Sequence, residues 1–149
     1  MRIVIQRVVR AAVRVEGRTI GEIGKGLLLL VGVGKEDKRE SIRALADKVV
    51  QLRIFSDEEH RMNRSLGEAG GEILCVSQFT LYGDCRKGRR PSYDRAARSE
   101  DARAMFESFV GFLRDSGATV HTGQFQAMME VESVNDGPVT LLLDSEKTI

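Results

Sequence analysis

A run of eight residues without a polar side chain, Gly26 to Val33, constrains the fold of this chain most strongly. The run is far shorter than the roughly 20 apolar residues that span a bilayer. A strand with one buried face alternates apolar and polar residues, whereas a strand covered on both faces is apolar throughout. The run therefore predicts a central strand with structure packed on both faces.

The segments around this run predict the rest of a sheet. Residues 1–15 alternate apolar and polar side chains, which indicates two strands with one buried face. A hairpin turn is expected at Glu16-Gly17-Arg18, and a loop or small hairpin over residues 56–71. The other expected strands are 72–81, 118–122, 127–134 and 139–144, with Asn135-Asp136-Gly137-Pro138 as a turn between the last two.

Two segments show the three- and four-residue spacing of apolar side chains that is typical of a helix lying on a sheet. The first begins with a capping-box pattern from Asp37 to Glu40, and the second begins at a Ser99 cap and stops at Gly117. Two helices can cover one face of a sheet only. We therefore expect an α/β fold with mixed β-sheets in layers, two amphipathic helices on one side and the order β-β-β-α-β-α-β-β-β.

Length and composition limit the class of protein. The chain has 149 residues, 42% of them hydrophobic, so 1–149 is expected to form one domain. The N-terminal residues contain spaced arginines and no continuous apolar stretch, which argues against a signal peptide. Cys75 and Cys85 lack the spacing of a zinc site or a disulfide framework. These features predict a cytoplasmic protein with reduced thiols and no membrane partner.

Common catalytic motifs are missing from the sequence. It contains no GxxxxGK[ST] phosphate loop, no strict GxGxxG, no HExxH and no GxSxG elbow. His60 and His121 are the only histidines, and each fits a surface or strand position better than a ligand position. We expect no metal and no cofactor.

Two polar clusters could carry chemistry. Ser77-Gln78-Phe79-Thr80 ends an apolar strand, where hydroxyls, an amide and backbone N–H groups could bind a carbonyl or its developing oxyanion. The simpler interpretation is a strand that becomes polar where it meets solvent. The second cluster, Asn135 to Thr140, reads on its own as an ordinary turn, and the sequence does not give the isomer of the Gly137-Pro138 bond.

The net charge of +1 conceals one basic segment. Residues 84–98 contain six basic and two acidic side chains, a local charge of +4, so the rest of the chain carries −3. A charge run is usually a solvated loop. However, cations separated only by glycine also suit the phosphates that dominate affinity for nucleic acid. The cations that would contact such phosphates are Arg86, Lys87, Arg89 and Arg90.

Three motifs in this order resemble the D-aminoacyl-tRNA deacylases, also called D-Tyr-tRNA deacylases. They are Ser77-Gln78-Phe79-Thr80-Leu81, then Lys87-Gly88-Arg89-Arg90-Pro91-Ser92, then Asn135-Asp136-Gly137-Pro138-Val139-Thr140. The resemblance covers nearly the whole chain. It implies a homodimer of mixed sheets with helices on one side, which hydrolyses the ester between a D-amino acid, or glycine, and the 3′ end of tRNA.

The resemblance also assigns roles to residues. It implies that Ser77, Gln78 and Thr80 are catalytic and that Phe79 helps to hold the aminoacyl adenosine. Gly137-Pro138 would have a cis bond and reach the partner subunit's site, held in place by Arg7. The Phe125 carbonyl would bind the substrate amino group. Gln126 stands where the family commonly has glycine, so it either alters the pocket wall or points outward.

Several alternatives stay open at this point. Thr80 could be a nucleophile, although no base lies beside it in sequence, or water could attack with help from the 2′-OH of the terminal adenosine. An enzyme that accepts many D side chains must read the configuration at Cα, by excluding any substituent larger than hydrogen on one side. Other readings of the chain are a non-catalytic RNA-binding module and a small-molecule hydrolase.

Overall fold

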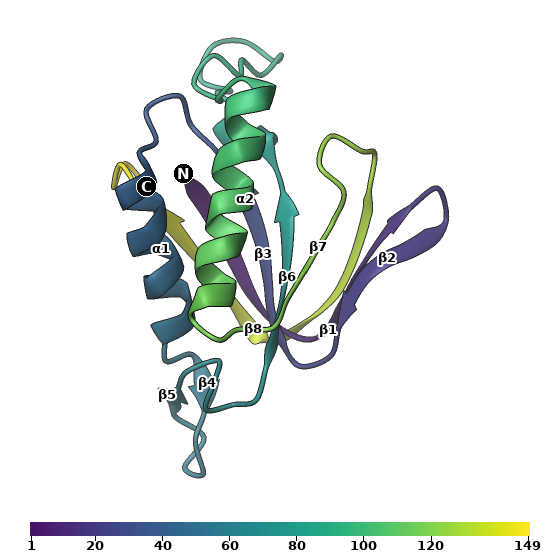
Figure 1. Ribbon diagram of the computed structural model, residues 1–149, viewed down its shortest axis with the longest axis vertical. Coiled ribbons are helices and arrows are strands. Elements are labelled where there is room, and N and C mark those ends of the chain that lie inside the picture. The colour runs from purple at the N-terminus through teal and green to yellow at the C-terminus, as the bar shows by residue number, and fades with distance from the viewer.

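The computed structural model describes residues 1–149 and contains one mixed sheet, a small hairpin and two helices (Figure 1). In chain order the elements are β1 (Arg2–Val15), β2 (Arg18–Ile23), β3 (Gly26–Gly32), α1 (Arg39–Gln51), β4 (Phe55–Ser56), β5 (Met62–Arg64), β6 (Glu72–Ser77), the 3-10 turn η1 (Phe79–Tyr82), α2 (Ser99–Asp115), β7 (Val120–Thr122) and β8 (Glu130–Asp144). The expected α/β class with mixed strands is confirmed.

The main sheet has the order β2-β1-β3-β6-β7. β2 and β3 pair with different halves of one edge of β1, and β8 pairs along its opposite edge. The pairs β3–β6 and β6–β7 are parallel, and all the pairs that β1 makes are antiparallel. As the apolar run predicts, β3 is a central strand, lying between β1 and β6. The expectation of two strands in residues 1–15 is wrong, because β1 is a single long strand whose first half pairs with β3 and whose second half pairs with β2.

The C-terminal strands also differ from expectation. Residues 130–144 form one strand rather than two, because β8 stays paired with β1 on both sides of Asn135 to Pro138. The pairing shifts there, so that Gln6 faces Thr140 and Val8 faces Asn135, and residues 136–139 bulge out opposite Arg7 alone. The Gly137-Pro138 bond in this bulge is cis.

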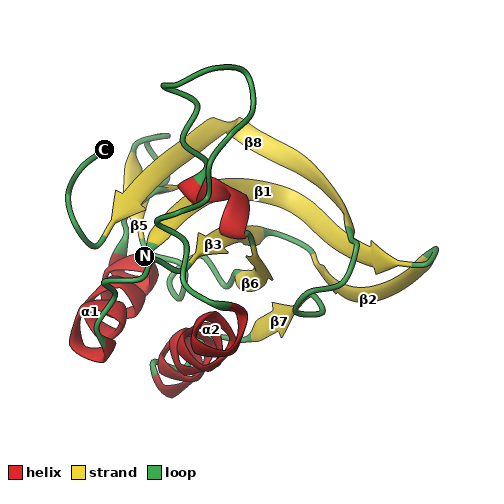
Figure 2. Cartoon of the chain, turned by 90° about the horizontal axis from the view of Figure 1, so that it is seen from above, coloured by secondary structure: helices red, strands yellow, loops and turns green.

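Both helices lie on one face of the sheet, as predicted (Figure 2). Buried side chains of α1 (Ile42, Val49) and α2 (Phe109, Leu113) join those of the strands in a core of 23 residues. A smaller core of seven residues, including Val8 and Leu74, fills the opposite, concave face. This face is concave because the sheet curls.

The curl of the sheet brings its two ends together. A Cβ on Gly21 in β2 would lie 2.8 Å from the carbonyl oxygen of Thr122 in β7, so this close approach requires glycine. The hairpin turn at residues 16–18 and the stop at Gly117, where φ is +87°, are as predicted. None of the helices combines the length and the apolar content needed to cross a bilayer.

The predicted helix caps are wrong, and both for the same reason. Lys38 and Arg98 occupy the cap positions and make no side-chain cap. Asp37 instead accepts hydrogen bonds from the Gly34 N–H, at 2.7 Å, and from the N-terminal ammonium group. Ser99 is the first residue of α2, and its hydroxyl accepts a hydrogen bond from the Gln126 side chain. Partners outside the helices thus take the polar atoms that a cap would use.

Candidate functional site

The strand-end cluster lies where β6 stops. The expected strand 72–81 is shorter than predicted, because it ends at Ser77 and the chain turns into η1. The Gln78 N–H still donates to the Val31 carbonyl at 2.7 Å, which anchors the turn to the sheet. Ser77 and Gln78 are half-buried, and Phe79 and Thr80 are exposed, so the cluster presents its side chains on a rigid support.

Residues 77–80 all line one cavity of about 820 Å³. Its opposite wall comes from residues 125–131, and its remaining lining is Val76 in β6, Ala97 before α2 and Ser99 at the start of α2. The cavity therefore brings the strand end together with Phe125, which resemblance alone connected to it. The lining residues that sequence reasoning did not assign to the site are Val76, Ala97, Ser99, Ala127, Met128, Met129 and Val131.

No side chain that lines this cavity titrates near neutral pH. Its polar groups are the hydroxyls of Ser77, Ser99 and Thr80 and the amides of Gln78 and Gln126. Gln78 Nε2 donates to Thr80 Oγ1 at 2.7 Å. An amide N–H donor cannot accept the threonine proton, so the nearest partner of Thr80 is not a base. The site can donate hydrogen bonds to a carbonyl or oxyanion, but its side chains offer no general base.

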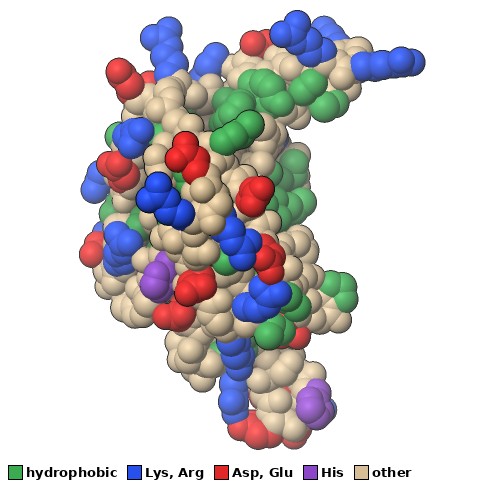
Figure 3. All heavy atoms as spheres, turned by 90° about the vertical axis from the view of Figure 1, so that its right-hand side faces the viewer, with side chains coloured by type: hydrophobic (Ala, Val, Ile, Leu, Met, Phe, Trp, Pro, Cys, Tyr) green, Lys and Arg blue, Asp and Glu red, His purple; other side chains and the backbone are tan.

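The outer rim of the cavity is apolar. Phe79 is 58% exposed and Met128 is 93% exposed, and both line the cavity together with the partly exposed Val131. In the space-filling view, apolar side chains gather beneath the projecting top of the molecule, from which Lys and Arg side chains extend (Figure 3). An exposed ring next to cations is a suitable surface for a base and its phosphates.

The basic segment, residues 84–98, forms a loop that contacts this rim. Asp84 and Ser92 pair across its base, and the Tyr93 ring packs edge-on to Phe79 with 5.0 Å between ring centroids. Further along, Ala97 N–H donates to Val33 O at 2.9 Å. The loop is thus fixed at both ends and connected to the cavity through Phe79.

The cations of the loop are not equivalent. Arg86 is bound to Asp84 through both its side chain and its backbone N–H, and these bonds hold the pKa of the Asp84 carboxyl well below its usual range. Lys87, Arg89 and Arg90 make no hydrogen bond or ion pair in the structure. Three of the four cations assigned to tRNA are therefore free, whereas Arg86 helps to shape the loop.

Gly137 and Pro138 do not line the cavity of their own chain. Their bulge is instead held by Arg7, which is 8% exposed. Arg7 Nη1 donates to the Ile54 carbonyl at 2.6 Å, and Arg7 Nε lies 3.0 Å from an Asp136 carboxylate oxygen. Asn135 Nδ2 donates to the Arg7 carbonyl at 3.1 Å and to the Val139 carbonyl at 3.0 Å. The predicted association of Arg7 with this motif is present.

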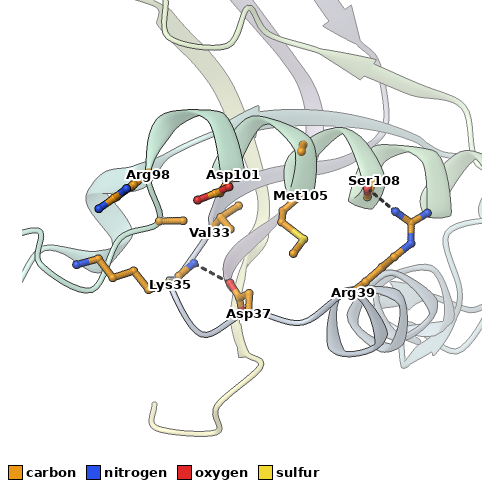
Figure 4. A pocket seen from close by; sticks show the side chains of 11 residues that line it. Val33, Lys35, Asp37, Arg39, Arg98, Asp101, Met105 and Ser108 are labelled. Atoms are coloured by element: carbon orange, nitrogen blue, oxygen red, sulfur yellow. Dashed lines mark hydrogen bonds between the residues drawn. The ribbon is translucent and has the colours of Figure 1, made fainter.

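A second cavity, of about 630 Å³, lies between the β3–α1 connection and α2 (Figure 4). None of the predicted site residues lines it. Part of its polar lining is satisfied internally, since Asp37 accepts from the Gly34 N–H and Arg39 Nη1 donates to Ser108 Oγ at 3.1 Å. Cys75 is likewise unsuited to chemistry, because complete burial raises the pKa of its thiol.

Comparison with known proteins agrees with this geometry. A family model described as D-Tyr-tRNA(Tyr) deacylase matches residues 4–144. A D-aminoacyl-tRNA deacylase of Thermosipho africanus is 58% identical over 147 residues, which cover 99% of both chains. A solved structure titled c-Myc DNA Unwinding Element Binding Protein is 39% identical, covers 97% of this chain and 98% of its own, and superposes with a TM-score of 0.91.

A second solved structure, of a probable eukaryotic D-amino acid tRNA deacylase, has the same fold at 18% identity, with 95% of this chain and 97% of its own covered and a TM-score of 0.81. The fold and the relatives together define a hydrolase that acts on aminoacyl-tRNA. More narrowly, the chain belongs to the D-aminoacyl-tRNA deacylase family. The family and the type of enzyme expected from the three motifs are confirmed.

Proposed function

We propose that this chain hydrolyses the ester of D-aminoacyl-tRNA, and of glycine mischarged on tRNA(Ala), and so releases the amino acid and free tRNA. The observation that carries the proposal is one cavity that joins Ser77–Thr80 to Phe125, next to a loop with three unpaired cations. The hydroxyls and amides suit an aminoacyl ester, and the cations suit the phosphates next to it.

The tRNA acceptor end would bind in two parts. The terminal adenosine and its amino acid would enter the cavity, with the exposed Phe79 ring as a stacking surface for the base. Lys87, Arg89 and Arg90 would neutralise phosphates of the preceding nucleotides, whereas Arg86 would act through the shape of the loop.

Selection of the D configuration would come from exclusion. The cavity of one chain lacks Gly137 and Pro138, so we propose a homodimer in which this pair enters the cavity of the partner subunit. A stiff backbone wall beside Cα would admit hydrogen and reject any larger substituent there. Glycine has no such substituent, so sterics alone would let it pass.

The chemistry would need no ionisable side chain. An aminoacyl ester is activated, and water could attack it with help from the 2′-OH of the adenosine. Gln78, Ser77 and backbone N–H groups of the strand end would stabilise the oxyanion. Thr80 as a nucleophile is the alternative. Its hydroxyl receives a hydrogen bond from Gln78 and faces no base, which favours the water mechanism.

The variant Thr80→Ala separates these mechanisms. Under the water mechanism it keeps substantial turnover of D-Tyr-tRNA in single-turnover assays with saturating enzyme. Near-complete loss of turnover with unchanged substrate binding would instead make Thr80 the nucleophile.

The activity itself is tested with purified protein and matched D- and L-Tyr-tRNA. We expect rapid release of D-tyrosine, slow release of L-tyrosine and release of glycine from Gly-tRNA(Ala). Binding of both tRNAs without preferential release of D-tyrosine would contradict the proposal and favour a binding module.

Shared sites can be tested by mixing two inactive variants. Gly137→Val strains a backbone with φ of +121° and disrupts the motif, and Ser77→Trp fills the cavity. After subunit exchange, half of the dimers are mixed and each has one intact site, so we expect about a quarter of wild-type activity to return. Absence of any recovery after proven exchange would contradict a shared site.

A further inference from the structure

The loop between β7 and β8 forms one wall of the cavity, yet it has few anchors. At its start the Gly123 N–H donates to the Cys75 carbonyl at 3.2 Å. Within the loop the Ala127 N–H donates to the Gln124 carbonyl at 3.2 Å, which closes a turn but connects the loop to nothing else. The position of this wall must therefore depend largely on side chains.

The Gln126 side chain makes both hydrogen bonds that connect this loop to α2. Its Nε2 donates to the Ser99 hydroxyl, and its Oε1 accepts from Arg103 Nη2 at 3.5 Å. Both partners lie in the first two turns of α2. Ser99 also lines the cavity, so the contact joins two walls of the same cavity.

The backbone of Gln126 does not favour this residue. Its φ is +64°, in the left-handed region that glycine adopts without steric cost. A glutamine at this position is explained by what its side chain contacts and not by the shape of the turn.

We infer that Gln126 is a positioning residue for the proposed deacylation, and the inference rests on that function. Its side chain fixes the loop to α2 and so sets the distance between Phe125 and the strand end at Ser77–Thr80. Phe125 itself packs on Phe106, with 6.1 Å between ring centroids, and the Arg103 guanidinium lies 4.8 Å above its ring. Arg103 therefore couples the Gln126 amide to the Phe125 ring.

The variant Gln126→Gly separates this role from stability. It removes both hydrogen bonds but suits the backbone conformation, so the melting temperature should stay unchanged or rise. Losing hydrogen bonds that pre-position the wall should raise KM for D-Tyr-tRNA about three- to tenfold, with kcat close to wild type. Gln126→Glu keeps an acceptor for Arg103 and can accept a hydrogen bond from the Ser99 hydroxyl, so its KM should stay near the wild-type value.

The matched control is Gln124→Gly. Gln124 is exposed in the same loop and its side chain makes no hydrogen bond, so this variant adds the same backbone freedom without removing a contact. KM should stay near the wild-type value. Equal increases in KM for the two glycine variants, or none for Gln126→Gly, would overturn the inference.

Hydrogen exchange tests the same contact without substrate. Amides of residues 124–129 should exchange faster in Gln126→Gly than in wild type and Gln124→Gly. Unchanged exchange would overturn the inference even in an active enzyme. Failure of the wild-type protein to release D-tyrosine would instead contradict the proposed function, and the exchange result would still decide whether Gln126 holds the loop.

Discussion

Replacing Arg7 with methionine tests how the Gly137-Pro138 bulge is held. Methionine keeps most of the length and apolar packing of the arginine stem but removes every donor. The Ile54 carbonyl, which accepts from Arg7 Nη1 at 2.6 Å, belongs to a buried residue and would lose this partner. The Asp136 side chain is 44% exposed, so water can replace Arg7 there.

The magnitude follows from this difference. An unsatisfied buried polar group costs about 1–3 kcal/mol, and the exposed Asp136 adds little. The free energy of unfolding of Arg7→Met should therefore fall by about 1–3 kcal/mol. At about 2–4 °C per kcal/mol for a chain of this size, the melting temperature should fall by about 2–12 °C.

Urea denaturation followed by circular dichroism measures this change, and deacylation of D-Tyr-tRNA is measured well below the transition. We expect kcat/KM to fall by more than the folded fraction does, because the bulge loses its support. The control is Arg10→Met on the same strand, whose 55%-exposed side chain pairs with Glu132 at the surface. It should change stability by less than about 0.5 kcal/mol. If Arg7→Met were as stable and as active as this control, the assignment of Arg7 to the bulge would be refuted.

Three further predictions concern the basic loop, the two cysteines and the pH dependence of the activity. Replacing Lys87, Arg89 and Arg90 together with alanine should weaken tRNA binding and reduce the slope of log K against log salt concentration by about 2–3, seen in filter binding at several salt concentrations. Iodoacetamide should modify exposed Cys85 in the native protein and reach buried Cys75 only after unfolding, as mass spectrometry would show. Because no cavity side chain titrates near neutral pH, kcat/KM should show no bell-shaped dependence between pH 6 and 8.

Burial patterns made most of the fold predictable. The apolar run Gly26 to Val33 and the two amphipathic helices are consequences of which side chains avoid water, and each lies where expected. The helix caps were not predictable, because the polar atoms of Asp37 and Ser99 are taken by groups outside the helices, among them the N-terminal ammonium group and Gln126. Local rules cannot anticipate such competition.

The site was predictable on one side only. The polar strand end at residues 77–80 has a signal in the sequence, whereas the opposite wall at 126–131, made of the β7–β8 loop and the start of β8, has mixed residues without one. Charge counting also treated Arg86 like its neighbours. The Asp84 carboxylate two residues before it was a usable signal, because an Asp side chain readily bonds to backbone N–H groups two residues ahead.

The bulge in β8 shows why a correct local preference can predict the wrong topology. Residues 135–138 have the composition of a turn, and the chain does leave the ladder there. The chain does not reverse, because β1 pairs with β8 on both sides of the bulge. Within the bulge, the Arg7 side chain supplies hydrogen bonds that the strand pairing lacks. Its guanidinium bonds to Asp136, and Asn135 bonds back to the Arg7 carbonyl. One buried arginine thus satisfies the backbone that a turn would expose, which is why its removal should loosen the motif and leave the rest of the sheet intact.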